Sequence, residues 1–155
     1  MLFGLTVLTG LVYPLAVIGI GQNFVKPEYI HPRLSAAGKD GYDASASSGT
    51  NLGPTSADLK KAIDDRVAAA RADGVTGPIP DDMVTSASGL DPDISPANAF
   101  AQAPRVTKAR GLDVAVVRDL VTKSTVGGTD GLLGPHVNVL AINRQLDAMA
   151  AQAAK

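Results

Sequence analysis

The chain has 155 residues, carries 15 acidic and 14 basic side chains for a formal net charge of −1, and contains no cysteine. A near-neutral charge without a basic stripe argues against a nucleic-acid partner. The absence of cysteine excludes disulfides and thiolate metal sites. The distribution of charge divides the chain into an uncharged stem, residues 1–21, and a body, residues 22–155, whose length suits one domain.

The stem lies before the first charged side chain, Lys26. A helix of about 20 residues crosses a hydrocarbon core of about 30 Å and satisfies its own backbone groups there. We therefore expect residues 1–21 to form a single transmembrane helix that Pro14 kinks. A cleaved signal peptide and a buried core helix are the alternatives, although no basic residue precedes the run and Gly19-Ile20-Gly21 is a poor cleavage pattern.

The first part of the body is predicted to be mostly loop. Residues 22–54 are polar and rich in glycine and proline, which favours turns. Thr55 is the predicted N-cap of a helix over 56–73, and Gly74 suits the left-handed position at its end.

The middle of the body is predicted to hold one extended segment and two short helices. Residues 83–87 are the extended candidate. Ser95 caps a helix that reaches about Gln102, and Pro104 begins a second helix that Gly111 ends.

The last part of the body is predicted to contain a helix, a strand and a final helix. Asp113 caps a helix that ends near residue 123, with Leu112 and Val117 as its hydrophobic staple. Alternation over 137–142 predicts a strand, and Asn143 is the predicted cap of the final helix. The expected fold class is a loop-rich α+β domain behind a single membrane helix.

Catalytic and metal-binding motifs are weak throughout the sequence. Neither His31 nor His136 has a second ligand at helical spacing, and the glycine-rich run 127–131 lacks the ending of a phosphate loop. No serine lies in a G-x-S-x-G elbow, but a triad of Ser86 or Ser88 with a histidine stays open because triads are spatial. The residues thus predict a membrane-tethered, non-catalytic body. A membrane-anchored or secreted serine hydrolase is the alternative, and a solute-binding protein is a third.

Several motifs occur in a fixed order along the chain. They are L-T-G-L-V-Y-P-L at 8–15, I-G-Q-N-F at 20–24, Y-I-H-P-R-L-S-A at 29–36, S-G-T-N-L-G-P-T at 48–55, V-T-S-A-S-G-L-D-P-D-I-S-P at 84–96, P-R-V at 104–106 and V-N-V-L at 137–140. In this order they resemble the KdpC family, the C subunits of Kdp potassium-transporting P-type ATPases. The family has a connecting stretch between the first two motifs, whereas Leu15 and Ile20 are almost adjacent here, so the chain is internally shortened.

The resemblance implies an accessory subunit of a potassium pump. It implies that the chain assembles or stabilises a channel-like A subunit and an ATPase B subunit, and raises the ATP affinity of the latter. It implies no catalytic residue, no metal and no cofactor in this chain, with ATP and K⁺ handled by the complex. Candidates for the nucleotide effect are Ser86, Ser88, Gly89 and Gln102. Candidates for contact with the partner subunits are Thr9, Gly10, Tyr13, Pro14, Gln22, Asn23 and Phe24.

The resemblance also implies a single-pass protein of the bacterial cell membrane with its body outside the cytoplasm. The charge rule points the other way, because Lys26, Arg33 and Lys39 follow the stem closely. We expect the family's orientation, in which a hydrocarbon core of about 30 Å separates the body from cytoplasmic ATP. Four acids could steer potassium by their field, although a solvated loop is the simpler interpretation. These are Asp81, Asp82, Asp91 and Asp93.

Overall fold

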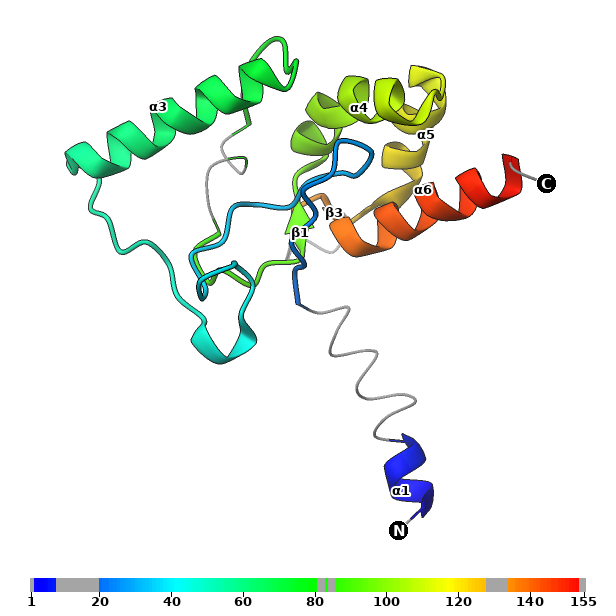
Figure 1. Ribbon diagram of the computed structural model, residues 1–155, viewed down its shortest axis with the longest axis horizontal. Coiled ribbons are helices and arrows are strands. Elements are labelled where there is room, and N and C mark those ends of the chain that lie inside the picture. The colour runs from blue at the N-terminus through cyan, green and yellow to red at the C-terminus, as the bar shows by residue number, and fades with distance from the viewer. Residues whose placement is uncertain (1, 8–19, 81–82, 84–85, 128–133, 154–155) are drawn as a thin grey trace.

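The computed structural model describes residues 2–7, 20–80, 83, 86–127 and 134–153. The elements in chain order are α1 (Leu2–Val7), the 3-10 helix η2 (Ala44–Ala46), α3 (Ala57–Ala72), β1 (Asp93–Ile94), α4 (Pro96–Arg110), α5 (Val114–Ser124), β2 (Thr125–Val126), β3 (His136–Asn138) and α6 (Val139–Ala153). Figure 1 shows α4, α5 and α6 gathered around a small sheet, with α3 set apart. The α+β class predicted from the sequence is confirmed.

The sheet has three very short strands in the order β1-β3-β2, with both neighbouring pairs antiparallel. Its central strand β3 pairs through Val137 with Ile94 on one side and Thr125 on the other. Helices α4, α5 and α6 all contact β3, and α4 also packs along α5. The three helices therefore pack around the central strand of the sheet.

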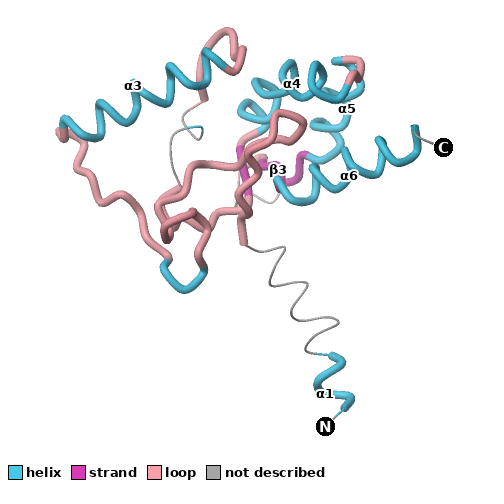
Figure 2. The backbone as a smooth tube through the Cα atoms, in the orientation of Figure 1, coloured by secondary structure: helices cyan, strands magenta, loops and turns pink. Residues whose placement is uncertain are grey.

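The hydrophobic core lies in this C-terminal cluster. Of the described residues, its buried members are Ile30, Ile94, Ala99, Ala103, Val106, Val117, Leu120, Val121, Val137, Val139, Ile142 and Leu146. Only Ile30 comes from outside residues 94–146. The long path of residues 20–56, drawn as loop over most of its length in Figure 2, therefore contributes only Ile30 to this buried core.

Helix α3 is close to its predicted position. Its cap is Ser56 rather than Thr55, because the Ser56 hydroxyl accepts a hydrogen bond from the Leu59 amide. Gly74 has the predicted left-handed backbone, with φ of 85°. None of the helix's residues is buried, so α3 rests on the body through partly exposed side chains.

Helix α4 is one helix and not the two short ones predicted. Pro104 lies inside it, where it removes one ladder hydrogen bond. The helix continues because Ala103 and Val106, on either side of the proline, are fully buried in the core. Tertiary packing thus outweighs the local break that the sequence predicted.

The predicted strand 137–142 is shorter than expected, because helix α6 already begins at Val139. Val139, Ile142 and Leu146 are all buried, so their spacing is helical and the apparent alternation misleads. The Asn138 side chain caps the helix by accepting from the Ala141 amide, so the predicted cap at Asn143 is wrong.

Two further predictions concern the N-terminal stem and the extended segment. The stem contributes α1, and residues 8–19 lie outside the described residues. Within the described ranges, no helix combines the length and apolar composition that a membrane crossing needs. The transmembrane helix over 1–21 therefore stays a prediction. Of the extended candidate 83–87, residues 84 and 85 are not described, and the other three positions carry no strand.

Candidate functional site

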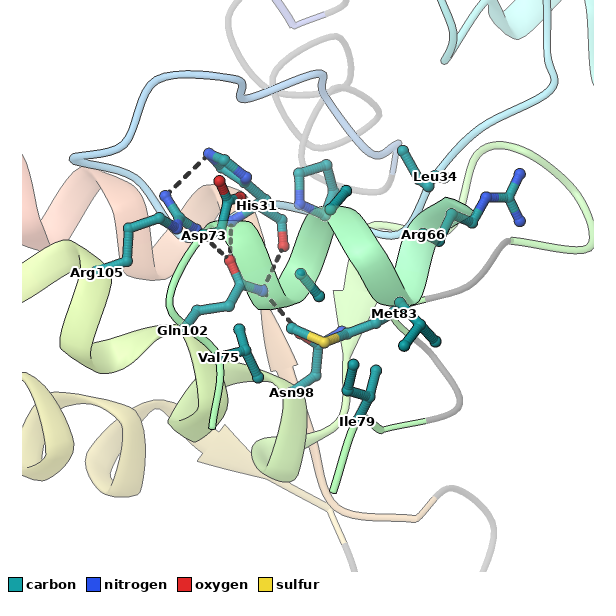
Figure 3. A pocket seen from close by; sticks show the side chains of 14 residues that line it. His31, Leu34, Arg66, Asp73, Val75, Ile79, Met83, Asn98, Gln102 and Arg105 are labelled. Atoms are coloured by element: carbon teal, nitrogen blue, oxygen red, sulfur yellow. Dashed lines mark hydrogen bonds between the residues drawn. The ribbon is translucent and has the colours of Figure 1, made fainter. Parts of the chain in front are cut away.

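A pocket of about 170 Å³ lies between α3, α4 and the segment that runs through His31 to Leu34. Its walls are largely apolar and include Val67, Val75 and Ile79. Figure 3 shows Gln102 and Arg105 of α4 joined by hydrogen bonds to His31, and Asn98 joined to Gln102. Gln102, one of the nucleotide candidates, is therefore part of the pocket floor.

Gln102 is buried and uses its whole amide. Its Oε1 accepts from the His31 amide at 2.7 Å and from Arg105 Nη2 at 2.6 Å. Its Nε2 donates to the His31 carbonyl at 3.0 Å and to Asn98 Oδ1 at 2.7 Å. Gln102 thus holds both backbone groups of one residue, as a neighbouring strand would.

Asn143, which lies on helix α6, binds both backbone groups of Ile30, the residue before His31. Its Oδ1 accepts from the Ile30 amide at 2.8 Å, and its Nδ2 donates to the Ile30 carbonyl at 2.9 Å. Asn143 is 1% exposed and Ile30 is 0% exposed, so these bonds are shielded from solvent. Two adjacent residues in a loop are therefore paired by side-chain amides instead of by a strand.

Two arginines of α4 bind the backbone carbonyls of the three residues that precede Ile30 in the chain. Arg105 Nη1 donates to the carbonyls of Pro27 and Tyr29, at 2.9 and 3.1 Å. Arg110 Nε donates to the Glu28 carbonyl at 2.6 Å, and its guanidinium lies 5.1 Å from the centre of the Tyr29 ring. We call Gln102, Arg105, Arg110 and Asn143 together the backbone clamp, because they fix the path of residues 27–31.

Several groups around His31 act in opposite directions on its pKa. Its Nε2 lies 2.9 Å from the Lys26 carbonyl and 3.1 Å from Arg105 Nη1. Burial lowers the pKa of His31, and the nearby Arg105 charge lowers it further, while the Lys26 carbonyl and Asp73 oppose the shift. Burial also lowers the pKa of Arg105. The neutral imidazole is therefore the form that this site favours.

The other nucleotide candidates form a tight turn. Ser86 is buried, and its Oγ accepts from the Gly89 amide at 3.0 Å while its own amide donates to the Leu34 carbonyl. Ser88 Oγ accepts from the Leu90 amide at 3.2 Å. Gly89 has φ of 70°, and a Cβ there would lie 2.8 Å from the Ser48 carbonyl oxygen. The polar groups of these residues are engaged with backbone, and their role in a nucleotide effect stays a prediction.

The serine hydrolase alternative requires a histidine beside one of these serines. In the part of the chain that the structure describes, neither imidazole hydrogen-bonds a serine hydroxyl. His31 is engaged as above, and His136 Nδ1 lies 2.9 Å from the Gly134 carbonyl oxygen. No three His, Cys, Asp or Glu side chains group into a metal site among the described residues.

The acidic candidates take part in local structure where they are described. Asp91 Oδ1 accepts from the Asp93 amide at 3.0 Å, which closes a local turn, and Asp91 pairs with Arg33 at 3.4 Å. Asp81 and Asp82 lie outside the described residues. Steering of potassium by these four acids stays a prediction.

Some of the candidates for contact with the partner subunits are described by the structure and the others are not. Thr9, Gly10, Tyr13 and Pro14 all lie outside the described residues. Asn23 donates from Nδ2 to the Asp40 carbonyl, and the Phe24 ring packs 5.2 Å from the Tyr29 ring, centre to centre. Gln22 accepts from the Phe24 amide through its carbonyl. Part of the I-G-Q-N-F motif therefore serves the body itself.

Sequence reasoning did not predict the backbone clamp. Asn143 is predicted to cap a helix, and Arg105 is only part of the P-R-V motif. A usable signal existed in α4, where Asn98 and Gln102 share a helix face with the alanines of the core. Polar residues on a buried face must find partners, and here those partners are loop backbone.

Comparison with known proteins agrees with the motif order. The family model described as "KdpC: K+-transporting ATPase, c chain" matches residues 19–148. The potassium-transporting ATPase KdpC subunit of Caulobacter sp. (strain K31) is 49% identical over 172 aligned positions, which cover 92% of this chain and 87% of the relative. The KdpC subunit of Nitratidesulfovibrio vulgaris (strain DSM 19637 / Miyazaki F) is 54% identical over 135 positions, covering 84% and 68%. That of Beijerinckia indica is 47% identical over 173 positions, covering 92% and 87%.

The lengths of these alignments bear on the predicted shortening. The Caulobacter alignment has 172 positions and this chain has 155 residues, so part of the relative has no counterpart here. An internally shortened chain is expected to give this result. With a family match over most of its length and relatives near half identity, the chain belongs to the KdpC family, the C subunits of potassium-transporting ATPases.

Proposed function

We propose that the chain assembles and stabilises the channel-like and ATPase subunits of a potassium pump and performs no chemistry of its own. In this proposal, residues 1–21 anchor it in the bacterial cell membrane and the body lies outside the cytoplasm. Its family relatives are named as subunits of a potassium-transporting ATPase. A subunit with this role needs a body of fixed shape more than it needs reactive groups.

The backbone clamp is the observation that carries the proposal. Gln102, Asn143, Arg105 and Arg110 all form hydrogen bonds with the backbone of residues 27–31, at distances between 2.6 and 3.1 Å. Among the described residues, no buried side-chain nitrogen or oxygen lacks a partner. Polar networks that are fully satisfied rigidify a structure, which suits a protein that presents a surface to larger partners.

The effect on ATP affinity is proposed to act through the partner subunit's conformation. Binding of nucleotide by Ser86, Gly89 or Gln102 would require their present hydrogen bonds to break. Each such bond contributes about 0.5–1.5 kcal/mol, so direct binding starts at a disadvantage. A change in partner conformation carries no such cost in this chain.

Co-expression with the two larger subunits tests the proposal. The unsubstituted chain is expected to co-purify with both from membranes, and the complex is expected to show potassium-stimulated ATPase activity. Leaving the chain out should reduce recovery of the other two as a complex. Failure of the chain to co-purify, or ester or peptide turnover by the chain alone, would overturn the proposal.

Protease digestion of intact spheroplasts tests the orientation. A body outside the cytoplasm is digested without lysis, whereas a cytoplasmic body is protected until the membrane is opened.

A further inference from the structure

The N-terminal segment enters the body through a narrow socket at Gly21. This glycine is buried, and its amide donates to the Leu90 carbonyl at 2.9 Å. A Cβ at this position would collide with the Tyr42 ring and would lie 2.7 Å from the Asp91 carbonyl oxygen. The backbone at Gly21 therefore fits between a side chain and a loop with no room for any other residue.

The Tyr42 wall of the socket is itself held in place. Its hydroxyl donates to the Arg33 carbonyl, and its amide donates to Ser35 Oγ at 2.8 Å. Its φ of 59° is rare for an aromatic residue, and a backbone of this kind persists only where the surroundings determine it. The Arg33 side chain in turn pairs with Asp91 across the socket.

The residues after Gly21 add two more attachments. Asn23 Nδ2 donates to the Asp40 carbonyl at 3.1 Å, next to the Tyr42 wall. Phe24 packs against the hydrophobic core and the Tyr29 ring. Beyond it the backbone clamp holds residues 27–31. Residues 21–31 are thus attached at short intervals, unlike a flexible linker, whose direction is lost within a few residues.

We propose that Gly21 and Tyr42 are positioning residues that fix the direction in which the N-terminal segment leaves the body. The consequence for assembly rests on the proposed function. If the chain is a membrane-anchored subunit, a fixed exit direction gives the body one orientation relative to the membrane and to the larger subunits. Without the socket the body would sample many orientations, and each contact with a partner would first have to restrict them.

Distance measurement between spin labels tests the socket directly. Because the chain has no cysteine, Ile20→Cys and Val116→Cys place labels only at the entry and on an exposed position of α5. In the full chain in lipid vesicles we expect one narrow distance distribution. Gly21→Ala is expected to widen it by about twofold or more, as release of a tethered segment would. Gly53→Ala, where a Cβ meets nothing within 4 Å, is the matched control and should leave the width unchanged.

Two further measurements separate positioning from folding. The far-UV circular dichroism spectrum of Gly21→Ala should match that of the unsubstituted chain, because the helical core lies elsewhere, although the clash of the new Cβ with Tyr42 is expected to lower Tm. If that variant does not fold, the double variant Asn23→Ala, Tyr42→Phe removes one attachment of the segment and the hydrogen bond that holds the Tyr42 ring, adds no bulk, and must also widen the distribution. A broad distribution in the unsubstituted chain, or an unchanged width in the folded variant, would overturn the inference.

Complex recovery then tests the consequence. Gly21→Ala is expected to lower recovery with the larger subunits by about threefold or more, because the fixed geometry of the two attached parts is lost. If the unsubstituted chain itself fails to co-purify, the proposed function fails while the label distances still decide the socket. Normal recovery of a variant with a widened distribution would overturn the role of the socket in assembly.

Discussion

Removal of the Asn143 side chain should weaken the body more than any exposed polar substitution. Asn143→Ala leaves the amide and carbonyl of Ile30 without partners, in a position that is 0% exposed. An unsatisfied buried polar group costs about 1–3 kcal/mol, so the two together should cost about 2–4 kcal/mol after some relaxation. At roughly 4 °C for each kcal/mol in a domain of this size, Tm should fall by about 10 °C.

Urea and thermal unfolding of the purified full chain, followed by circular dichroism, measure this loss. Gln145→Ala on the same helix is the control, because Gln145 is exposed and should change stability by less than about 0.5 kcal/mol. If Asn143→Ala costs no more than this control, the backbone clamp is not what holds Ile30, and the reasoning fails.

Three further changes test other parts of the body. The free energy of unfolding should fall as pH drops below about 6.5, because the pKa of His31 is lowered in the folded chain and the unfolded chain binds the proton more readily. His31→Gln should remove this contribution to the pH dependence, measured by urea unfolding at stepped pH. An unchanged pH dependence would contradict the prediction. Gly89→Ala should cost about 1–3 kcal/mol more than Gly111→Ala in urea unfolding, since both backbones are left-handed but only Gly89 is enclosed; equal losses would show that enclosure is unimportant. Pro104→Ala should raise Tm slightly by restoring an amide donor to α4, whereas a clear drop would mean that ring packing outweighs that donor.

Local signals predicted much of the secondary structure. Asp113 caps α5 as expected, accepting from the Ala115 amide at 2.7 Å, and Val117 of the predicted staple is buried. These features depend on residues within one turn, which a sequence displays directly. Pro104 was misjudged because its penalty is local, whereas the packing that overrides it depends on α5.

The candidate site was harder to predict for the same reason. Gln102 was selected through family resemblance, yet its partners are the backbone groups of His31, 71 residues earlier. Asn143 and Ile30 are separated by 113 positions. Every residue carries the same backbone amide and carbonyl, apart from the missing amide hydrogen of proline. The residue type of the partner therefore gives no sign that a distant side chain binds its backbone, and only the folded arrangement identifies the pair.

The span between these partners has a consequence for biosynthesis. A ribosome delivers residues 27–31 long before the helices whose side chains bind them. Helix α4 supplies part of the backbone clamp and α6 supplies Asn143, so this early stretch cannot be fully bound until α6 has emerged. Of the helices that the structure describes, α6 is translated last, and its Asn143 therefore completes the attachment of residues 27–31 to the body.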